Sequence, residues 1–193
     1  LVGATYTSIP TTLLAMVDAS VGGKTAVNFP PFGKNLIGSF YFPKRVFIEP
    51  QWLDSLSDRE YYSGGSECLK HAFLLGDKQL ITSLVTDLRH KKYSALAPLL
   101  YRLVSLKAQI VEEDPYEQGR RVLLNFGHTL GHALEAMSQK NRQVYLQTIC
   151  HGQAVALGML CAVIISHRLG FLPKKSYEYF VKTLVDSGCL ISK

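Results

Sequence analysis

The chain has 193 residues, of which 47% are hydrophobic and 19% are charged, and its formal net charge is +6. This composition excludes an intrinsically disordered chain, because the apolar residues suffice to bury a core that offsets the entropy of ordering. The 15 Gly and 8 Pro exclude collagen-like and low-complexity chains. The length fits one domain, or one domain and part of another.

No targeting or membrane segment is predicted. The longest apolar run, residues 154–165, is too short to cross a bilayer, and residues 1–5 show no basic region followed by an apolar one. The first residue is not Met, so we expect the chain to begin within a longer protein. The four cysteines lie far apart without a CxxC pair, which argues against a disulfide framework and predicts a reducing, cytoplasmic location.

The excess of positive charge suits an anionic partner, either a phosphorylated metabolite or nucleic acid. Nucleic-acid binding is weakly supported, because no stripe of Lys and Arg alternates with aromatic residues. The sequence therefore favours a small phosphorylated substrate over a nucleic-acid or membrane partner.

The first fifty residues have mixed character. Residues 2–10 are β-prone, and residues 11–17 predict a short helix with a threonine cap. Residues 18–40 are rich in Gly, Pro, Lys and Asn, which predicts loops or hairpins. A short strand is expected at residues 45–48. Residues 1–50 are therefore predicted to be a mixed α/β segment.

From residue 51 onward the hydrophobic residues recur at helical spacing, as in residues 80–88 and 99–111. Further helices are predicted at roughly 64–75, 127–138, 152–169 and 175–187. The predicted fold class is therefore the end of an α/β domain followed by an all-α domain at residues 51–193. Residues 139–147 are polar and predict a surface loop.

The strongest local signal is the run from Asn125 to His132, NFGHTLGH. His128 and His132 are four residues apart, which places them on one face of a helix. No Glu stands between them, so the HExxH zinc-protease motif does not apply. They are either two histidines that are hydrogen-bonded in a core or part of a site, and the flanking glycines and preceding arginines favour a site.

A third imidazole and a carboxylate accompany this pair. His151 precedes an apolar helix, and Glu67 lies near the start of another. Glu67, His128 and His151 would form a zinc shell with an open fourth position, although spacing alone does not show that they converge. Other histidines remain available, namely His71, His90 and His167.

Several lysines lie in unusual surroundings. The segment from Asp18 to Thr25 ends in Gly-Lys-Thr, but position 18 is Asp rather than the Gly that a P-loop needs. Lys24, Lys34 and Asn35 lie in Gly-rich turns, where they could hold a phosphate or carboxylate or be merely solvated. Lys107 lies on an apolar helix and could snorkel or face an anion, and Lys70 raises the same question.

Four motifs, in this order, resemble those of the 3-dehydroquinate synthase family: residues 10–25, 33–40, 123–135 and 151–159. The resemblance implies a Rossmann-like NAD domain joined to an α-helical domain, with the active site between them. Residues 1–50 would be the C-terminal part of the α/β NAD-binding domain, and residues 51–193 would be the α-helical metal- and substrate-binding domain. It implies a carbon–oxygen lyase of the shikimate pathway, which converts 3-deoxy-D-arabino-heptulosonate 7-phosphate to 3-dehydroquinate and phosphate. The implied cofactors are NAD and Zn²⁺ (or Co²⁺), and the implied assembly is a homodimer.

The resemblance also implies roles for individual residues. The implied metal ligands are Glu67, His128 and His151. The implied proton-transfer residues are His132 and Glu117. The implied substrate-binding residues are Asp18, Lys24, Asn35, Lys70, Lys107, Arg121 and Asn125. The implied NAD contacts are Thr11, Thr12, Lys34, Trp52, Leu53, Asp54 and Ser55.

Departures from the family pattern leave alternatives open. The Gly-rich NAD-binding half would precede Pro10, Gln153 stands where a Glu usually follows His-Gly, and residues 139–147 lengthen one interval. The alternatives are another sugar phosphate cyclase, a metal-dependent alcohol dehydrogenase, or an inactive module that lacks the NAD-binding half. We expect little or no turnover from these 193 residues alone, and ordinary activity if they are part of a longer chain.

Overall fold

The structure is a computed structural model that describes residues 4–29, 33–91, 93–140 and 149–190. The strands are β1 (Thr7–Ser8), β2 (Lys24–Phe29), β3 (Gly33–Phe40) and β4 (Arg45–Val46). The α-helices are α1 (Asp58–Leu75), α2 (Lys78–His90), α3 (Tyr93–Glu113), α4 (His128–Lys140), α5 (His151–Arg168) and α6 (Lys174–Asp186). Three short helical turns complete the described elements: the π-helical Ala15–Ala19 and the 3₁₀-helical Pro50–Ser55 and Arg120–Asn125.

Among the described residues, the β-structure lies within the first fifty positions, as predicted. β2 and β3 form an antiparallel hairpin in which Val27 lies opposite Ile37, and β1 pairs in parallel with β4. The expected helix of residues 11–17 is found at residues 13–19 and becomes a wider π-helical turn at Ala15–Ala19. Thr12 caps it, because its Oγ1 accepts a hydrogen bond of 3.2 Å from the Ala15 amide.

The helical predictions for the remainder are confirmed to within one or two residues for α4, α5 and α6. α1 begins six residues earlier than the predicted residue 64, at Asp58. It starts there because the Ser57 hydroxyl accepts a hydrogen bond from the Glu60 amide, and it ends at Gly76, whose left-handed backbone (φ 69°) suits glycine.

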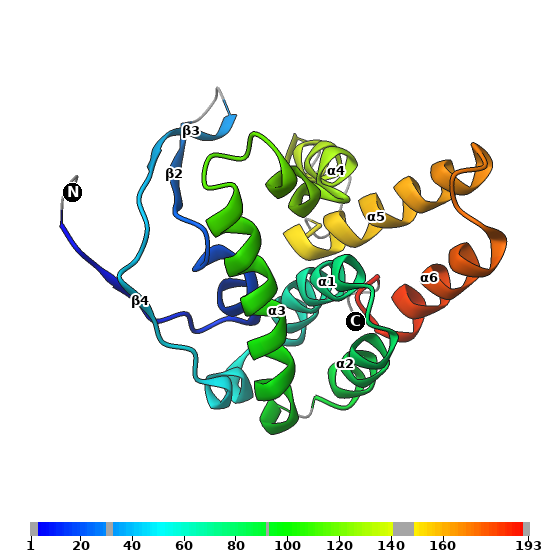
Figure 1. Cartoon of the computed structure of the whole chain (residues 1–193), viewed down its shortest axis with the longest axis horizontal. Coiled ribbons are helices and arrows are strands. Elements are labelled where there is room, and N and C mark those ends of the chain that lie inside the picture. Colours follow the sequence, from blue (N-terminus) through cyan, green and yellow to red (C-terminus); the bar gives the residue numbers. More distant parts are fainter. Residues whose placement is uncertain (1–3, 30–32, 92, 141–148, 191–193) are drawn as a thin grey trace.

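α1 is the central helix of the molecule (Figure 1). It packs against α2, α3 and α5, and every residue from 63 to 72 is buried. Two serines and two glycines at residues 63–66 make this close packing possible, because small side chains let neighbouring helices approach. A polar residue at positions 63–72 of α1 is consequently held in the interior, whichever face of the helix it occupies.

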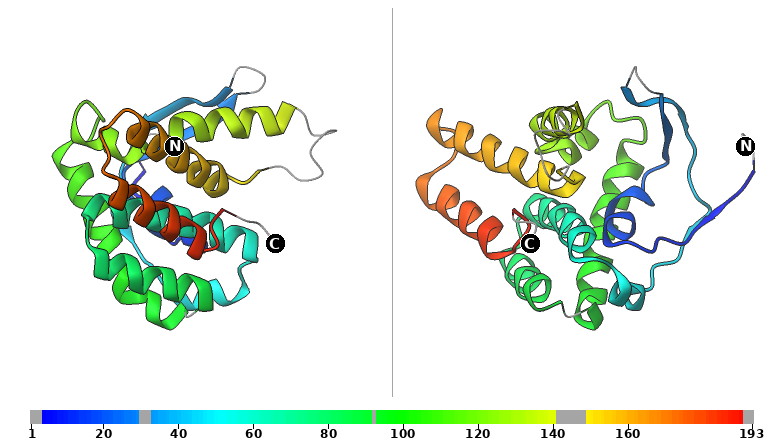
Figure 2. Two further views of the ribbon diagram at one scale, coloured as in Figure 1. Left: turned by 90° about the vertical axis from the view of Figure 1, so that its right-hand side faces the viewer. Right: turned by 180° about the vertical axis from the view of Figure 1, so that it is seen from behind.

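The short helix before the hairpin belongs to the same core. Leu13, Met16 and Val17 are fully buried together with side chains of α1, α2 and α3. Within the described residues, the two sides of the predicted boundary at residue 50 therefore share one hydrophobic core. The division into two domains at that residue stays a prediction. α4 and α5 lie side by side above α1, and the hairpin lies at the opposite end of the molecule from α6 (Figures 1 and 2).

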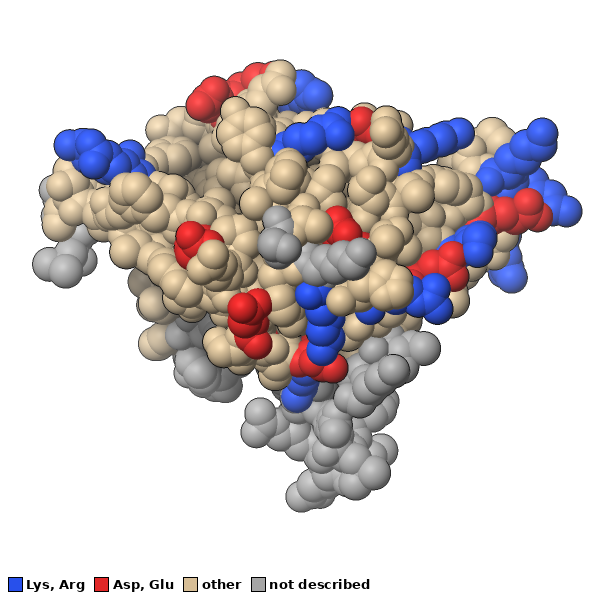
Figure 3. Space-filling model, turned by 90° about the horizontal axis from the view of Figure 1, so that it is seen from below, with Lys and Arg blue, Asp and Glu red and all other residues tan. Residues whose placement is uncertain are grey.

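None of the described helices has the length and apolarity that a membrane span requires. On the face drawn in Figure 3, basic side chains are interspersed with acidic ones rather than gathered into one basic patch. Two ion pairs join residues four apart on α6, Lys174 with Glu178 (3.8 Å) and Lys182 with Asp186 (2.8 Å). Such exposed pairs contribute little to stability.

Candidate metal centre and surrounding cleft

A cleft of about 620 Å³ lies between the β2–β3 hairpin and the helices. Most of the residues for which the sequence predicted a metal, proton-transfer or substrate role line it: Asp18, Lys24, Lys70, Lys107, Glu117, Arg121, Asn125, His128, His132 and His151. The fold thus brings together residues from five separate segments, and this degree of convergence would not arise from an arbitrary set of polar residues.

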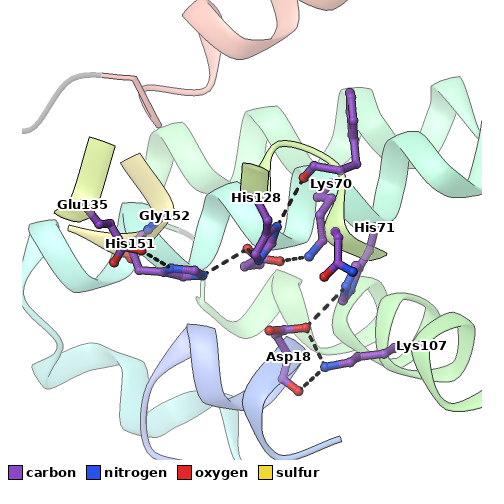
Figure 4. A network of polar contacts seen from close by, with 12 residues as sticks. Asp18, Lys70, His71, Lys107, His128, Glu135, His151 and Gly152 are labelled. Atoms are coloured by element: carbon purple, nitrogen blue, oxygen red, sulfur yellow. Dashed lines mark hydrogen bonds and ion pairs between the residues drawn. The ribbon is translucent and has the colours of Figure 1, made fainter. Parts of the chain in front are cut away.

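Glu67 comes together with His128 and His151, two cleft-lining residues whose side chains Figure 4 shows, and the ligand atoms of all three lie within 4.8 Å of one another. Glu67 Oε1 lies 3.7 Å from His128 Nε2 and 3.6 Å from His151 Nε2. These distances exceed those of good hydrogen bonds, but they are close to the roughly 3.3 Å that separates ligand atoms around a tetrahedral zinc ion. The Glu67 side chain is fully buried, and its Oε1 accepts no hydrogen bond from the described residues, while its Oε2 forms an ion pair with Lys70. This donor set therefore fits a divalent cation.

Close helix contacts hold the three side chains together. Gly152, next to His151, donates a backbone hydrogen bond of 2.9 Å to the Ser63 hydroxyl on α1. A Cβ atom on Gly152 would lie 2.0 Å from the Ser63 carbonyl oxygen, so only glycine permits this approach. On the other side, a Cβ on Gly158 would lie 1.9 Å from the Gly127 oxygen, beside His128. Glycine contacts on both sides therefore set the separation of the ligands.

Lys70 balances the buried carboxylate of Glu67. It lies one turn further along α1, is 1% exposed and forms an ion pair with Glu67 Oε2. Burial alone would raise the pKa of Glu67, but the charge of Lys70, with contributions from His151 and His128, lowers it to about 2. Glu67 is therefore ionised at neutral pH and able to act as a ligand.

The two histidines differ in their outward partners. His151 Nδ1 lies 3.4 Å from the carboxylate of Glu135, whereas His128 Nδ1 lies 3.4 Å from the Phe126 carbonyl oxygen. The neighbouring carboxylates of Glu135 and Glu67 raise the pKa of His151 to about 9. Burial and the charge of Lys70 lower the pKa of His128. Binding of a cation at His151 would therefore displace a proton.

A second acidic cluster lies beneath the first (Figure 4). Lys107 donates a hydrogen bond of 2.5 Å to Asp18 Oδ1, and His71 Nε2 lies 3.8 Å from the same oxygen. Burial would raise the pKa of Asp18, but Lys107 and Lys70 hold it well below its ordinary value. Asp18, Glu67 and His71 could also surround a cation by distance alone. The two lysine ammonium groups already pair with these carboxylates, so they disfavour a cation there.

Lys107 was open to two interpretations, and the snorkelling one is wrong. Its side chain is 8% exposed and turns inward to Asp18 rather than outward to water. Burial lowers the pKa of Lys107 while Asp18 opposes that change. The remaining interpretation is that Lys107 faces the polar cleft, of which it is a lining residue.

The outer rim of the cleft is built around Glu117. Its carboxylate forms an ion pair with Lys24 and accepts a hydrogen bond of 2.6 Å from Asn125 Nδ2. Burial raises the pKa of Glu117, but these two contacts outweigh it and lower the pKa below its ordinary value. The backbone of Glu117 is left-handed (φ 60°), which is a strained conformation for a residue other than glycine. Strain of this kind is common where a side chain must point into a functional site.

Asp114 organises the loop that carries Glu117 and Arg121. Its carboxylate accepts hydrogen bonds from the amides of Gln118 (2.9 Å), Gly119 (2.7 Å) and Arg121 (3.0 Å). The Arg121 guanidinium, which is almost fully buried, donates to the carbonyls of Pro115 (2.6 Å) and Gly22 (2.7 Å). This arrangement ties the loop to the turn before the hairpin.

Other predicted residues lie elsewhere. Thr11, Thr12 and the turn from Trp52 to Ser55 do not line the cleft, and the Leu53 side chain is fully buried in the core. Lys34 and Asn35 belong to β3, but their side chains lie outside the described part of the structure, as does most of the predicted loop at residues 139–147.

The remaining histidines do not join the Glu67 site. His90 is exposed at the end of α2, and His167 Nδ1 lies 2.9 Å from the Leu172 carbonyl. Gln153 closes the start of α5, because its Oε1 accepts a hydrogen bond of 3.3 Å from the Cys150 amide. The change from Glu to Gln at this position therefore preserves a helix cap.

Sequence reasoning missed Glu135 and Asp114 as individual residues. Glu135 could have been found from helical geometry, because it follows His128 by seven residues and therefore lies on the same face of α4. Asp114 carries no comparable signal, since an Asp before a Pro predicts only a turn.

Solved structures with this fold bind a cofactor and a metal ion. A 2-epi-5-epi-valiolone synthase from Streptomyces hygroscopicus, solved with NAD+ and Zn2+ bound, matches 97% of this chain and 51% of its own, with 26% identity and a TM-score of 0.81. A 2-deoxy-scyllo-inosose synthase complexed with carbaglucose-6-phosphate, NAD+ and Co2+ matches with the same coverage, 29% identity and a TM-score of 0.82. The fold is therefore that of the sugar phosphate cyclases.

Sequence comparison narrows this class. The profile described as 3-dehydroquinate synthase C-terminal matches residues 64–192, and the one described as 3-dehydroquinate synthase N-terminal matches residues 1–63. The chain belongs to the 3-dehydroquinate synthase family.

Curated relatives named 3-dehydroquinate synthase support the same assignment. The relative from Methylacidiphilum infernorum is 44% identical over 94% of this chain, and the one from Helicobacter pylori is 45% identical over 91%. This chain spans about half the length of each of them, 48% in both cases.

Proposed function

We propose that this chain is the metal- and substrate-binding part of a 3-dehydroquinate synthase. The reaction is the conversion of 3-deoxy-D-arabino-heptulosonate 7-phosphate to 3-dehydroquinate and phosphate, with NAD and Zn²⁺ (or Co²⁺), in the shikimate pathway. The observation that carries the proposal is the convergence of Glu67, His128 and His151 at the end of a cleft lined with cationic side chains. We further propose that the enzyme is a cytoplasmic homodimer, with residues 1–50 belonging to the NAD-binding domain and residues 51–193 forming the helical domain.

Glu67, His128 and His151 would hold the metal, leaving its outer side open to the cleft. A divalent ion there would polarise a substrate oxygen and lower the pKa of the hydroxyl to be oxidised. The chain's own contribution is a rigid, partly buried set of ligands, whose charge is balanced by Lys70 in the absence of the metal. Burial of the ligands also restricts the access of water to the inner end of the cleft.

Cationic residues of the cleft would hold the ends of the substrate. Arg121 uses its two Nη atoms for the Pro115 and Gly22 carbonyls, which fixes the guanidinium plane. A fixed guanidinium and the nearby ammonium of Lys107 suit a carboxylate. Lys24, half exposed at the mouth, suits the phosphate end together with Asn35, and Asp18 and Lys70 complete the polar shell. Asn125, which donates a hydrogen bond to Glu117, would also bind the substrate.

His132 and Glu117 would transfer protons. The His132 ring centroid lies 5.3 Å from that of His128 and 6.2 Å from that of His151, so its imidazole stands one helical turn from the metal ligands. An imidazole can both accept and donate a proton. Glu117, ionised because of Lys24 and Asn125, would serve as a proton acceptor at the rim.

The NAD contacts are proposed from the family pattern: Thr11, Thr12, Lys34, Trp52, Leu53, Asp54 and Ser55. Of these residues, Thr11, Thr12 and residues 52–55 lie outside the cleft lining described above. This placement is consistent with a cofactor that enters from the side of β1 and β4 rather than through the metal centre. Because Leu53 is fully buried, its contact would have to come from its backbone.

The second candidate is a sugar phosphate cyclase with a different substrate, which the similarity to the two solved cyclases favours. The higher identity to relatives named 3-dehydroquinate synthase, 40–45%, favours the first candidate. An inactive module is a third possibility, in which the site binds metal without turnover.

The deciding experiment is phosphate release by the natural protein that contains this sequence, loaded with Zn²⁺ and NAD. We expect release from 3-deoxy-D-arabino-heptulosonate 7-phosphate, little from sedoheptulose 7-phosphate, and loss of activity in His128→Ala. Net NADH formation at 340 nm would instead indicate a dehydrogenase, because the synthase reaction regenerates NAD in each turnover. Preference for sedoheptulose 7-phosphate would support the second candidate, and absence of turnover with either substrate would support the third.

A further inference from the structure

Glu135 is a buried acid to which the proposed function above assigns no role. It lies on α4 and is 6% exposed. Its position seven residues after His128 places it on the same face of the helix, two turns further along. Burying a carboxylate is costly unless a partner compensates for the lost hydration, so a specific function is expected.

The partner is the outer nitrogen of a metal-ligand histidine (Figure 4). Glu135 Oε2 lies 3.4 Å from His151 Nδ1, while His151 Nε2 faces Glu67 Oε1 at 3.6 Å. The two nitrogens of one imidazole thus point to two different carboxylates. An ionised carboxylate can only accept a hydrogen bond, so Nδ1 must carry the proton that is shared with Glu135.

The position of that proton decides what Nε2 can do. In a neutral imidazole, a proton on Nδ1 leaves the lone pair on Nε2, where it is directed toward Glu67 and His128. His128 is arranged in the same way, with its Nδ1 3.4 Å from the Phe126 carbonyl oxygen and its Nε2 toward Glu67. In both rings, Nδ1 therefore faces a hydrogen-bond acceptor, and the lone pair of Nε2 is directed toward Glu67.

We propose that Glu135 is a positioning residue of the metal centre, which fixes the tautomer and the ring orientation of His151 so that Nε2 faces the ion. This inference rests on the proposed function, since it presupposes that Glu67, His128 and His151 bind a metal. Acceptors behind metal-ligand histidines commonly change metal affinity by 10–100-fold. Glu135 carries a full negative charge, whereas Phe126 offers a neutral carbonyl, so Glu135 contributes more to the basicity of its histidine.

A different arrangement of the same residues has to be distinguished. His132, Glu135 and His151 also have potential ligand atoms within 4.8 Å of one another. Glu135 would then be a ligand itself, in a second position for a cation that uses His151 Nδ1. The 3.4 Å between His151 Nδ1 and Glu135 Oε2 is compatible with both arrangements. The positioning role is favoured because the alternative set includes the exposed His132, whereas none of Glu67, His128 and His151 is exposed.

The test is Co²⁺ and Zn²⁺ binding by this chain, which contains all three proposed ligands. Dissociation constants are measured by competition with a chromogenic chelator, stoichiometry by calorimetry, and coordination by the visible absorption of bound Co²⁺. The variants are Glu135→Gln, Glu135→Ala and His128→Ala. Glu178→Gln is the matched control, because Glu178 is an exposed acid of α6 that pairs with Lys174.

We expect one ion per wild-type chain, about 10-fold weaker binding in Glu135→Gln and about 100-fold weaker binding in Glu135→Ala, with wild-type affinity in the control. The visible spectrum of bound Co²⁺ should keep its tetrahedral form in Glu135→Gln, because the three ligands remain. Glu135→Gln preserves the volume and one acceptor oxygen, so it carries the test if Glu135→Ala does not fold.

Two outcomes overturn the inference. Wild-type affinity in both Glu135 variants shows that Glu135 has no positioning role. A second ion that is bound by the wild type and lost in Glu135→Gln shows that Glu135 is a ligand. In both cases a loss of binding in His128→Ala leaves the proposed function intact. Metal binding that survives in His128→Ala, or that is absent from the wild type, instead contradicts the proposed function, and the inference fails with it.

Discussion

The two walls of the cleft, one formed by the helices and one by the β2–β3 hairpin, differ in how deeply their side chains are buried. On the helical wall, Glu67 is fully buried, Lys70 is 1% exposed and Arg121 is 2% exposed. On the hairpin wall, Val27 is 63% exposed and Ile37 is 55% exposed, although they lie opposite each other on β2 and β3. The contrast indicates that the metal ligands are pre-positioned by helix packing, whereas the hairpin owes little of its stability to burial within these residues.

The largest loss of stability in the helical wall is expected when the charge that balances Glu67 is removed. Lys70→Met should destabilise the metal-free chain by about 3–5 kcal/mol, because it leaves a buried carboxylate without its partner. Zinc should restore much of this loss, since a bound cation takes over the compensation. Thermal unfolding with and without Zn²⁺ measures both effects.

A matched control for this variant is Lys174→Met, whose ammonium is largely exposed and pairs only with Glu178. It should change stability by less than about 0.5 kcal/mol. Equal destabilisation by the two variants would show that the Lys70–Glu67 pair is no more important than a surface pair.

The next effect concerns the distance between α5 and α1. Gly152→Ala should cost about 1–3 kcal/mol and weaken metal binding, because the added methyl group overlaps the Ser63 carbonyl and pushes His151 away from Glu67. Urea denaturation and Co²⁺ titration provide the two measurements. Ile165→Ala, a half-exposed position on the same helix, is the control and should leave Co²⁺ affinity unchanged. Unaltered Co²⁺ affinity in Gly152→Ala would refute the proposed role of the glycine contact.

The hairpin provides the complementary case. Replacing the exposed cross-strand pair, Val27→Thr with Ile37→Thr, should change stability by less than about 1 kcal/mol and leave metal affinity at the wild-type value. Chemical denaturation and Co²⁺ titration of the double variant measure this. A large loss of metal affinity would mean that the two walls are coupled and that the comparison above is mistaken.

The smallest effect is expected in the loop between the walls, and it depends on pH. Hydrogen bonds from the amides of Gln118, Arg121 and Gly119 lower the pKa of Asp114 in the folded chain. A lowered pKa stabilises the loop above the unfolded value of about 3.9, and this contribution is lost as the pH falls through the lower folded value. Hydrogen exchange of these three amides should therefore show protection at pH 6 that disappears in strong acid.

Asp114→Ala supplies the comparison for this pH dependence. Its loop amides should exchange fast at every pH, because the acceptor is missing. Protection that is equal in the wild type and in Asp114→Ala would show that the carboxylate does not hold the loop.

Much of the helical part was predictable because its signals are local. Apolar spacing located α2 and the C-terminal helices, and the interval between His128 and His132 placed both on one helix face. The start of α1 was placed too late, because residues 58–63 are polar or aromatic and show no apolar period. The cap residue Ser57 was the available signal for the true start.

The candidate site was only partly predictable. The residue types at positions 67, 128 and 151 suggested a zinc shell, and the family resemblance assigned them to it. Neither source could give the contacts of Glu135 with His151 or of Asp114 with its loop, since both depend on how far a helix or turn advances toward its neighbour. The inward turn of Lys107 toward Asp18 was equally hidden, because a lysine on an apolar helix face is compatible with either direction.

The sequence by itself determined the helices, the hairpin and the set of chemical groups, because backbone preferences and apolar periodicity act over a few neighbouring residues. Only the tertiary structure decided which of these groups meet, because that depends on helix separations set by contacts such as Gly152 against Ser63 and Gly158 against Gly127. A single methyl group at such a contact would shift a ligand by more than a metal–ligand bond tolerates, and no local pattern encodes that distance.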